Sequence, residues 1–229
     1  MKSALKFVMA LTVTILLMLA FRALVFTVYT VRGTAIEPAY KDGDRVLVNR
    51  WSYGLRTGGG GMFAYSRWAE RRAEKGELVV FNCPQDTLRP VRRREVMAYY
   101  CTGVPGDTAR AWSAALALPC RGEAVAVTKD NIELISHIYN RYEGRTAGIR
   151  SGQLYVDGRR KDCAVFKYDY YWLAPTSPDG RRDTARGMLV PDNHVIGRVV
   201  LKITPTRNKT GTHHKNDLTP TPTSPREGA

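Results

Sequence analysis

From Gly76 to Pro84 the chain reads GELVVFNCP, and from Tyr99 to Thr108 it reads YYCTGVPGDT. The first stretch contains a short apolar run rich in valine and ends at a proline, which is typical of a buried β-strand. The second stretch ends in Pro105-Gly106-Asp107, a combination of residues that favours a tight turn. Together the two stretches predict strands bounded by turns, and therefore a body that is mostly β.

The same kind of pattern recurs along the chain. The pair Asp157-Gly158 suits a two-residue hairpin turn. One helix is predicted in the body over 131–142, with Asn131 near its N-cap, apolar residues at helical spacing, and Gly144 after its end. The predicted strands are Val25–Arg32, Arg45–Asn49, Glu77–Phe81, Ala124–Val127, Gln153–Val156 and Val195–Ile203.

Two segments have the composition of irregular chain. Residues 58–61 are all glycine and predict a flexible loop. Residues 204–229 are rich in Thr, Pro, Lys and Asn without an apolar period, so they predict a disordered tail.

The N-terminus carries an uncharged stretch, FVMALTVTILLMLAF, from Phe7 to Phe21, with Lys6 and Arg22 at its ends. A bilayer core needs about 20 residues, which snorkelling of these two basic side chains would supply. A cleaved signal peptide and a buried core helix are the alternatives, but no clean small-x-small cleavage site follows. We therefore predict a transmembrane helix over 7–22. The lysines before it place residues 1–6 in the cytoplasm and the rest of the chain on the outer (periplasmic) side of the inner (plasma) membrane.

Three segments carry the candidate chemistry. The first runs from Gly33 to Arg50. The second consists of GELVVFNCP at 76–84 and YYCTGVPGDT at 99–108. The third consists of DYYWL at 169–173 and VPDNHVIGR at 190–198. In this order and at this spacing, they resemble the bacterial type I signal peptidase (leader peptidase) family over residues 1–203. The resemblance implies a membrane-anchored Ser/Lys protease that processes the signal peptides of exported proteins. It also implies a β domain over 23–203 with an inserted helical segment at about 109–167.

Both catalytic positions of that family are changed in this chain. The family's serine lies in an S-M-x-P segment, and the matching stretch Ala35-Ile36-Glu37-Pro38 has Ala35 at this position. The family's lysine lies four residues before the first glycine of G-x-P-G-D, where this chain has Tyr99. In such enzymes the serine hydroxyl attacks the scissile carbonyl and a desolvated, neutral lysine takes its proton. Neither catalytic group is present at its position.

Residues that shape the backbone are retained. They are Pro38, Gly103, Pro105, Gly106 and Asp107. The family's G-D-N and D-S-R segments correspond without gaps to 175–177 and 183–185, where only Asp183 survives. A scaffold kept without its catalytic groups predicts a catalytically inactive paralogue, a pseudoenzyme that binds or modulates. The implied partners are membrane lipid, signal peptides and an active signal peptidase paralogue.

Two other functions remain as alternatives. An active signal peptidase with relocated groups would need Thr34 as nucleophile, although a one-residue shift in an extended segment turns a side chain to the opposite face. A module for lipid or polyanion would use the net charge of +14, from 35 Lys and Arg against 21 Asp and Glu. The basic clusters are dispersed over turns instead of forming one helical stripe, which argues against nucleic acid as a partner.

The cysteines Cys83, Cys101, Cys120 and Cys163 lack CxxC spacing, so no zinc or other metal site is expected, and no cofactor. An oxidising compartment would allow one disulfide among them. Cys101 matches a cysteine of some family members, and the resemblance implies a buried thiol there.

Overall fold

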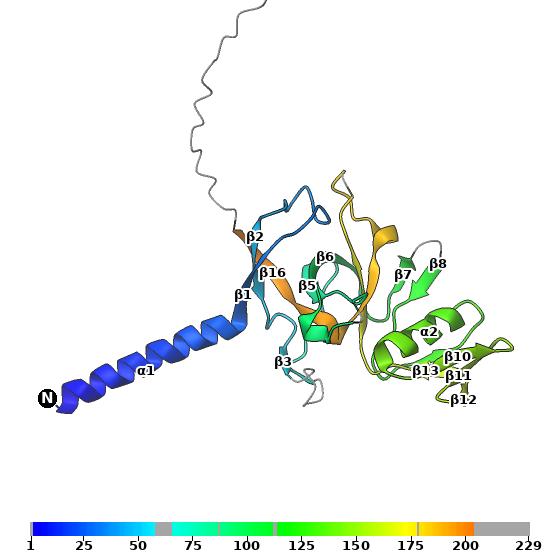
Figure 1. The fold of residues 1–229 in the computed structure, drawn as a ribbon, viewed down its shortest axis with the longest axis horizontal. Helices are drawn as coiled ribbons and strands as arrows, with labels where there is room; N and C mark the ends of the chain where they lie inside the picture. Colours follow the sequence, from blue (N-terminus) through cyan, green and yellow to red (C-terminus); the bar gives the residue numbers. More distant parts are fainter. Residues whose placement is uncertain (1, 58–65, 87, 112–113, 178, 204–229) are drawn as a thin grey trace, which may run out of the picture.

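The main structural unit is a seven-stranded antiparallel sheet in the order β1-β2-β16-β5-β6-β14-β15. The computed structural model describes residues 2–57, 66–86, 88–111, 114–177 and 179–203. Strands far apart in the chain lie side by side, since β16 pairs with β2 on one side and with β5 on the other (Figure 1). The strands of this sheet are β1 (Phe26–Thr30), β2 (Arg45–Asn49), β5 (Leu78–Asn82), β6 (Val96–Gly103), β14 (Tyr170–Ala174), β15 (Met188–Pro191) and β16 (Val195–Ile203).

Smaller sheets and helices surround this unit. The small sheets are β3 (Leu55–Thr57) with β4 (Ser66–Trp68), β7 (Thr108–Ala111) with β8 (Ala114–Ala117), β9 (Ala124–Ala126) with β13 (Cys163–Val165), and β10 (Ala147–Arg150), β11 (Gln153–Val156) and β12 (Arg159–Lys161) together. The helices are α1 (Lys2–Val25) and α2 (Ile132–Ile138), with short helical turns at Val91–Arg93, Tyr139–Glu143, Thr184–Arg186 and Asp192–His194. The fold is therefore mostly β, as predicted.

Two hydrophobic clusters hold these elements together. One lies on the large sheet, with Val48, Val79 and Phe81 fully or almost fully buried. The other packs α2 against the small sheets of residues 109–168, with Ile138 and Leu154 at its centre. Strand β14 contributes to both clusters, because alternate side chains of a strand point to opposite faces. The part of the chain predicted as an insertion thus packs on one face of β14.

Several local predictions are confirmed to the residue. The strands at 45–49, 153–156 and 195–203 have the predicted bounds. Asp157 and Gly158 both have positive φ angles, 51° and 79°, as a two-residue turn between antiparallel strands requires. The predicted helix over 131–142 is present as α2 followed by one π-helical turn, and Gly144 ends it in the left-handed conformation.

The N-terminal helix is longer than predicted. It continues to Val25 instead of ending near Arg22, and strand β1 starts at the next residue. The carbonyl of Val25 accepts a hydrogen bond from the amide of Arg50, which fixes the junction to the end of β2. In the described part of the chain, no helix combines the length and the apolar character needed to cross a membrane. The predicted glycine loop at 58–61 and the predicted tail at 204–229 lie outside the described residues.

Candidate functional site

The loop around Ala35 is held at both ends and in the middle by hydrogen bonds that backbone amides donate. The amide of Gly33 donates to Asp42 Oδ1 at 2.7 Å, and the amide of Gly43 donates to the Val31 carbonyl at 3.0 Å. The carbonyl of Ala35 accepts a hydrogen bond of 2.7 Å from the amide of Thr176. The loop therefore sits against the segment that follows β14, and its position is fixed by backbone contacts that any side chain at residue 35 would share.

The side chains at this loop offer no activated nucleophile. Ala35 is half-buried and presents only a methyl group. Thr34 is exposed, and within the described residues its hydroxyl makes no hydrogen bond. A threonine hydroxyl needs an adjacent base to become a nucleophile. The geometry thus gives no support to Thr34 in that role.

Tyr99 is a core residue of β6. It is 8% exposed and packs edge-to-face on Phe81 of β5, with ring centroids 5.5 Å apart. Burial raises the pKa of its phenol, and the nearby Cys83 adds to the effect. A phenol whose pKa is raised keeps its proton at neutral pH. The position that the resemblance assigns to the lysine is therefore filled by an aromatic side chain that stabilises the sheet.

Two lysines near the site are engaged in ion pairs. Lys75 Nζ lies 2.9 Å from Asp107 Oδ2. Lys202, on β16, lies 2.6 Å from Asp44 Oδ2 and donates to the Ala39 carbonyl at 2.8 Å. Sequence analysis missed the contact of Lys202 with the Ala35 loop, because it joins residues that are 163 positions apart. An ammonium group held by a carboxylate is not the desolvated amine that a Ser/Lys protease uses.

The retained motif residues stabilise the turn after β6. A methyl group on Gly103 would lie 2.7 Å from Leu118 Cδ1, and Gly106 has a φ of +89° that other residues rarely adopt. Pro105 is buried in the same turn. The Asp107 carboxylate accepts a hydrogen bond from the Val104 amide at 3.0 Å, which together with Lys75 lowers the pKa of Asp107. These residues keep the shape of the turn and need no catalytic role.

The resemblance places Ala185 at the arginine position of the D-S-R segment, and the structure shows an arginine paired with Asp183 at the following residue. Arg186, one residue later, donates from Nε to Asp183 Oδ2 at 2.5 Å, and its amide donates to Asp183 Oδ1 at 3.2 Å. The short helical turn at Thr184–Arg186 brings the two side chains together. The arginine of this pair lies three residues after the aspartate, whereas in a D-S-R segment it lies two residues after it.

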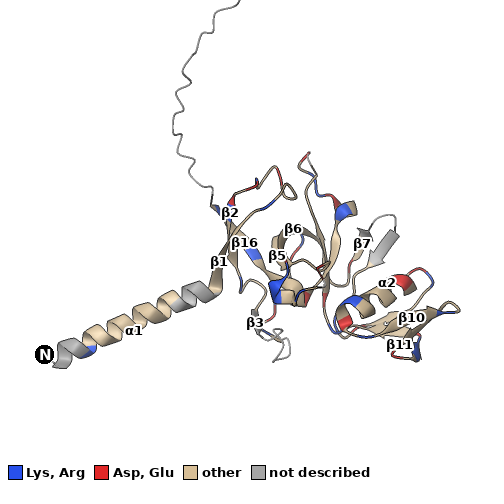
Figure 2. Ribbon diagram, in the orientation of Figure 1, with Lys and Arg blue, Asp and Glu red and all other residues tan. Residues whose placement is uncertain are grey.

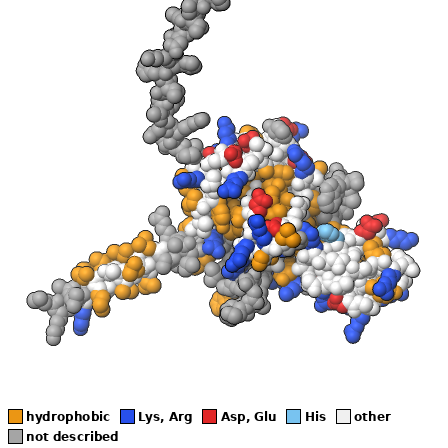
Figure 3. Space-filling model, viewed as in Figure 1, with side chains coloured by type: hydrophobic (Ala, Val, Ile, Leu, Met, Phe, Trp, Pro, Cys, Tyr) orange, Lys and Arg blue, Asp and Glu red, His pale blue; other side chains and the backbone are white. Residues whose placement is uncertain are grey.

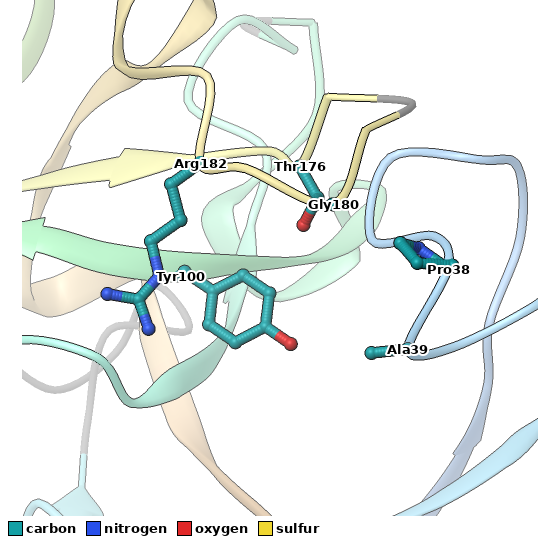
Figure 4. A pocket seen from close by; sticks show the side chains of 6 residues that line it. All are labelled: Pro38, Ala39, Tyr100, Thr176, Gly180 and Arg182. Carbon is teal, nitrogen blue, oxygen red and sulfur yellow. The ribbon is translucent and has the colours of Figure 1, made fainter.

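An open pocket of about 320 Å³ lies between the Ala35 loop and the segment after β14. Its lining residues are Pro38, Ala39, Tyr100, Thr176, Gly180 and Arg182 (Figure 4). Tyr100 lies on the face of β6 opposite to Tyr99, as the two-residue period of a strand dictates. Tyr100 and Arg182 were not predicted from the sequence as site residues. The two-residue period of a strand could have indicated that the side chains of Tyr99 and Tyr100 point to opposite faces.

Burial makes the thiols near the site inert. Cys83, Cys101 and Cys120 are buried free thiols and Cys163 is an exposed one, so none of the four forms a disulfide. Burial raises the pKa of Cys101 to about 12, with Glu77 contributing. The predicted buried thiol at Cys101 is confirmed. Among the residues that could be searched, no group of three His, Cys, Asp or Glu side chains could hold a metal ion.

The charges are distributed over the body. Figure 2 shows Lys and Arg on loops and elements throughout the molecule, with Asp and Glu between them. On the face seen in Figure 3, basic side chains also lie apart from one another and apolar side chains are prominent along α1. The basic residues are dispersed, as predicted from the sequence.

Comparisons with known proteins agree with the geometry. Residues 4–204 match the family described as signal peptidase, peptidase S26. Among curated proteins, Signal peptidase IB of Staphylococcus aureus is 31% identical over 108 residues in strains Mu50, N315 and MW2. Each match covers 46% of this chain and 44% of the relative, so the chain spans less than half the length of the curated relatives it matches.

Proposed function

The chain belongs to the signal peptidase family, peptidase S26, and from this premise we propose that it binds signal-peptide-like segments without cleaving them. The observation that carries this proposal is the pair of changed positions: residue 35 has only a methyl group, and residue 99 is a buried tyrosine. A Ser/Lys protease needs a hydroxyl and a neutral amine at these two places. The proposed role is in signal-peptide processing, as a binding or modulating partner of an active paralogue.

The proposed mode of binding is the addition of an extended peptide beside the Ala35 loop. Extended peptides bind by main-chain hydrogen bonds, while pockets accept alternate side chains. The pocket next to Pro38 and Ala39 has room for small side chains, such as those of an Ala-x-Ala segment. The firm attachment of the loop to Thr176 supports this mode, because a preformed site loses less conformational entropy on binding.

We further propose that α1 attaches the β domain to the plasma membrane, with the N-terminus in the cytoplasm and the domain on the outer side. Large apolar side chains of α1 are exposed, among them Phe7 at 70%, Leu17 at 66% and Met18 at 69%. Such a surface is unfavourable in water and favourable in contact with lipid. Cell fractionation with alkaline extraction would test the attachment, and recovery of the full chain in the extracted supernatant would contradict it.

Incubation of the purified chain with a preprotein tests the absence of cleavage. We expect no product at the signal-peptide junction by mass spectrometry, under conditions in which an active member of the family cleaves the same preprotein. Product formation would refute the proposal, and the Thr34→Ala variant would then show whether Thr34 is the nucleophile.

A gain of cleavage in the double variant Ala35→Ser with Tyr99→Lys would show that the site beside the Ala35 loop still receives the substrate. Each single variant serves as a matched control, because the serine and its base are both required. A parallel equilibrium binding measurement with the preprotein tests the binding role directly. Failure of the wild-type chain to bind would refute that role even if no cleavage occurs.

A further inference from the structure

The pocket beside the Ala35 loop is lined by an arginine whose guanidinium group contacts an aromatic ring. Arg182 lies with its Cζ 5.0 Å from the centroid of the Tyr100 ring, and within the described residues it makes no ion pair. Its neighbour Arg186 is held by Asp183. An arginine directed over a pocket and free of carboxylates is available to an anionic group from outside.

A second group in the same pocket lacks a partner. Thr176 is 8% exposed, and its Oγ1 is buried without a hydrogen bond. Figure 4 shows this hydroxyl directed into the space above Tyr100. A buried polar group without a partner is unfavourable, so an unsatisfied hydroxyl that lines a pocket points to a ligand that satisfies it.

The third polar group is the Tyr100 hydroxyl. Burial raises the pKa of Tyr100, with Tyr40 adding to the effect and Arg182 opposing it. The phenol is therefore neutral at physiological pH and can donate a hydrogen bond. The remaining lining residues are Pro38, Ala39 and Gly180, which are small and apolar, and none of the described lining residues is a carboxylate.

This set of groups defines the chemistry of a ligand. One cation and two hydroxyl donors around small apolar residues suit a single carboxylate attached to a small side chain. A guanidinium matches the planar geometry of a carboxylate and can bind it through two parallel hydrogen bonds. A phosphate-bearing lipid headgroup carries more charge and would favour a cluster of basic side chains, whereas Arg182 is the one basic side chain among the described residues that line this pocket.

We propose that the pocket binds the free C-terminal carboxylate of a peptide that ends in a small residue, with Arg182 as the principal ligand. This inference rests on the proposed binding function and specifies its ligand. A signal peptide cut after an Ala-x-Ala segment ends in this way, whereas an uncut preprotein does not. The chain would then recognise the released product in preference to the intact precursor.

Titration of the full chain in detergent with synthetic peptides tests the proposal. One peptide ends in Ala-Gln-Ala with a free carboxylate, and the second has the same sequence with a C-terminal amide. We expect the acid to bind at least about tenfold more tightly than the amide, a difference of about 1.4 kcal/mol. The variant Arg182→Gln should bind the acid as weakly as the amide, while Thr176→Val should weaken both.

Arg181→Gln is the matched control, because Arg181 is exposed on the same loop and does not line the pocket. We expect it to keep the preference for the acid. Thermal melts of all variants verify that folding is unchanged, as expected for the exposed Arg182. Equal binding of acid and amide by the wild type would overturn the inference while leaving the proposed binding function intact.

Two more outcomes would overturn the inference. If neither peptide binds, the proposed binding function fails as well. If inorganic phosphate or vesicles containing anionic lipid bind in a manner that depends on Arg182, and the peptide acid gains nothing over the amide, the pocket serves a phosphate-bearing ligand instead.

Discussion

Asp192 holds a carboxyl group in a place where its charge is poorly stabilised. The residue is 3% exposed, its Oδ2 lies 3.3 Å from the Arg121 guanidinium, and its Oδ1 is buried without a hydrogen bond. Burial raises the pKa of Asp192 to about 7, although Arg121 and Arg67 oppose this shift. The folded protein therefore holds this proton more tightly than the unfolded chain does. Its contribution to stability is present at low pH and is lost as pH rises from about 4 to about 7.

The Asp192→Asn variant keeps the shape of the protonated side chain and cannot acquire the charge. We expect its unfolding free energy, relative to that of the wild type, to increase by up to about 3 kcal/mol between pH ~5 and pH ~8. Chemical denaturation at the two pH values measures the change. Asp162→Asn is the control, since that side chain is 81% exposed. A difference that does not depend on pH would contradict the prediction.

The contribution of Glu77 to the unfolding free energy depends on pH in the opposite direction to that of Asp192. Burial alone would raise its pKa, but hydrogen bonds from Arg198 at 2.7 Å, from the Glu74 amide at 3.1 Å and from the Tyr53 hydroxyl at 2.8 Å lower it overall. A lowered pKa means that the carboxylate stabilises the fold above the pKa of the unfolded chain. That stability is lost as pH falls through the folded-state value.

We expect Glu77→Gln to lower the unfolding free energy by about 1.5–3 kcal/mol at neutral pH, because hydrogen bonds to a charged group are lost. The loss should shrink as the solution is acidified, and denaturation at several acidic pH values measures it. The exposed Glu74, which pairs with Arg71 at the surface, provides the control variant Glu74→Gln. A loss that grows on acidification would be incompatible with the lowered pKa.

The contacts of single residues could be predicted from the sequence only in part. The motif spacing located Ala35 and Tyr99, but the direction of each side chain depends on the register of β6 against β5 and β14. Lys202 contacts the Ala35 loop only because β16 pairs with β2. Such contacts depend on long-range pairing, which a motif along the chain does not specify.

At the scale of elements, short runs rich in β-branched residues and bounded by turn signals matched strands of the structure, and other strands were missed. Strand β2 was predicted because RVLVN is such a run and follows the turn signal Asp42-Gly43. Strand β6 was quoted as a motif without being predicted as a strand, and β3 and β4 were missed as well. Strands β3 and β4 have three residues each, and their composition alone does not distinguish them from loops.

Gly197 allows β16 to pass close to the end of β2. A methyl group at this position would lie 2.9 Å from the carbonyl carbon of Asn49 and 3.0 Å from Arg50 Cα, both of which are backbone atoms. The register of β16 against β5 also shifts between Val195 and Gly197. Strand β16 joins the two halves of the sheet, so a displacement here affects both neighbours.

We expect Gly197→Ala to lower the unfolding free energy by about 1–3 kcal/mol or more, because the backbone has to move apart. Thermal and chemical denaturation measure the loss. Gly148→Ala is the control, since a methyl group there would meet no atom within 4 Å. Equal stability of the two variants would show that β16 can shift without cost.

At the scale of the whole molecule, β14 makes the two hydrophobic clusters depend on each other. Tyr171 and Leu173 belong to the cluster of the large sheet, while Tyr170 and Trp172 belong to the cluster around α2. All five residues of the strand are buried. The motif DYYWL at 169–173 lies here, but its two buried faces could not be distinguished from the sequence, because a strand buried on both sides shows no polar period.

Trp172 provides the test of this dependence. It is 1% exposed, and its Nε1 donates to the Thr184 carbonyl at 3.0 Å. We expect Trp172→Leu to lower the unfolding free energy by about 2–5 kcal/mol, through the cavity and the lost hydrogen bond. Because both clusters share β14, hydrogen exchange should report the same loss at the amides of Val79 in one cluster and Leu154 in the other.

Trp68→Leu is the matched control, since Trp68 is 74% exposed and its removal should change the protection of neither amide. Loss of protection at Leu154 alone would mean that the two clusters unfold independently.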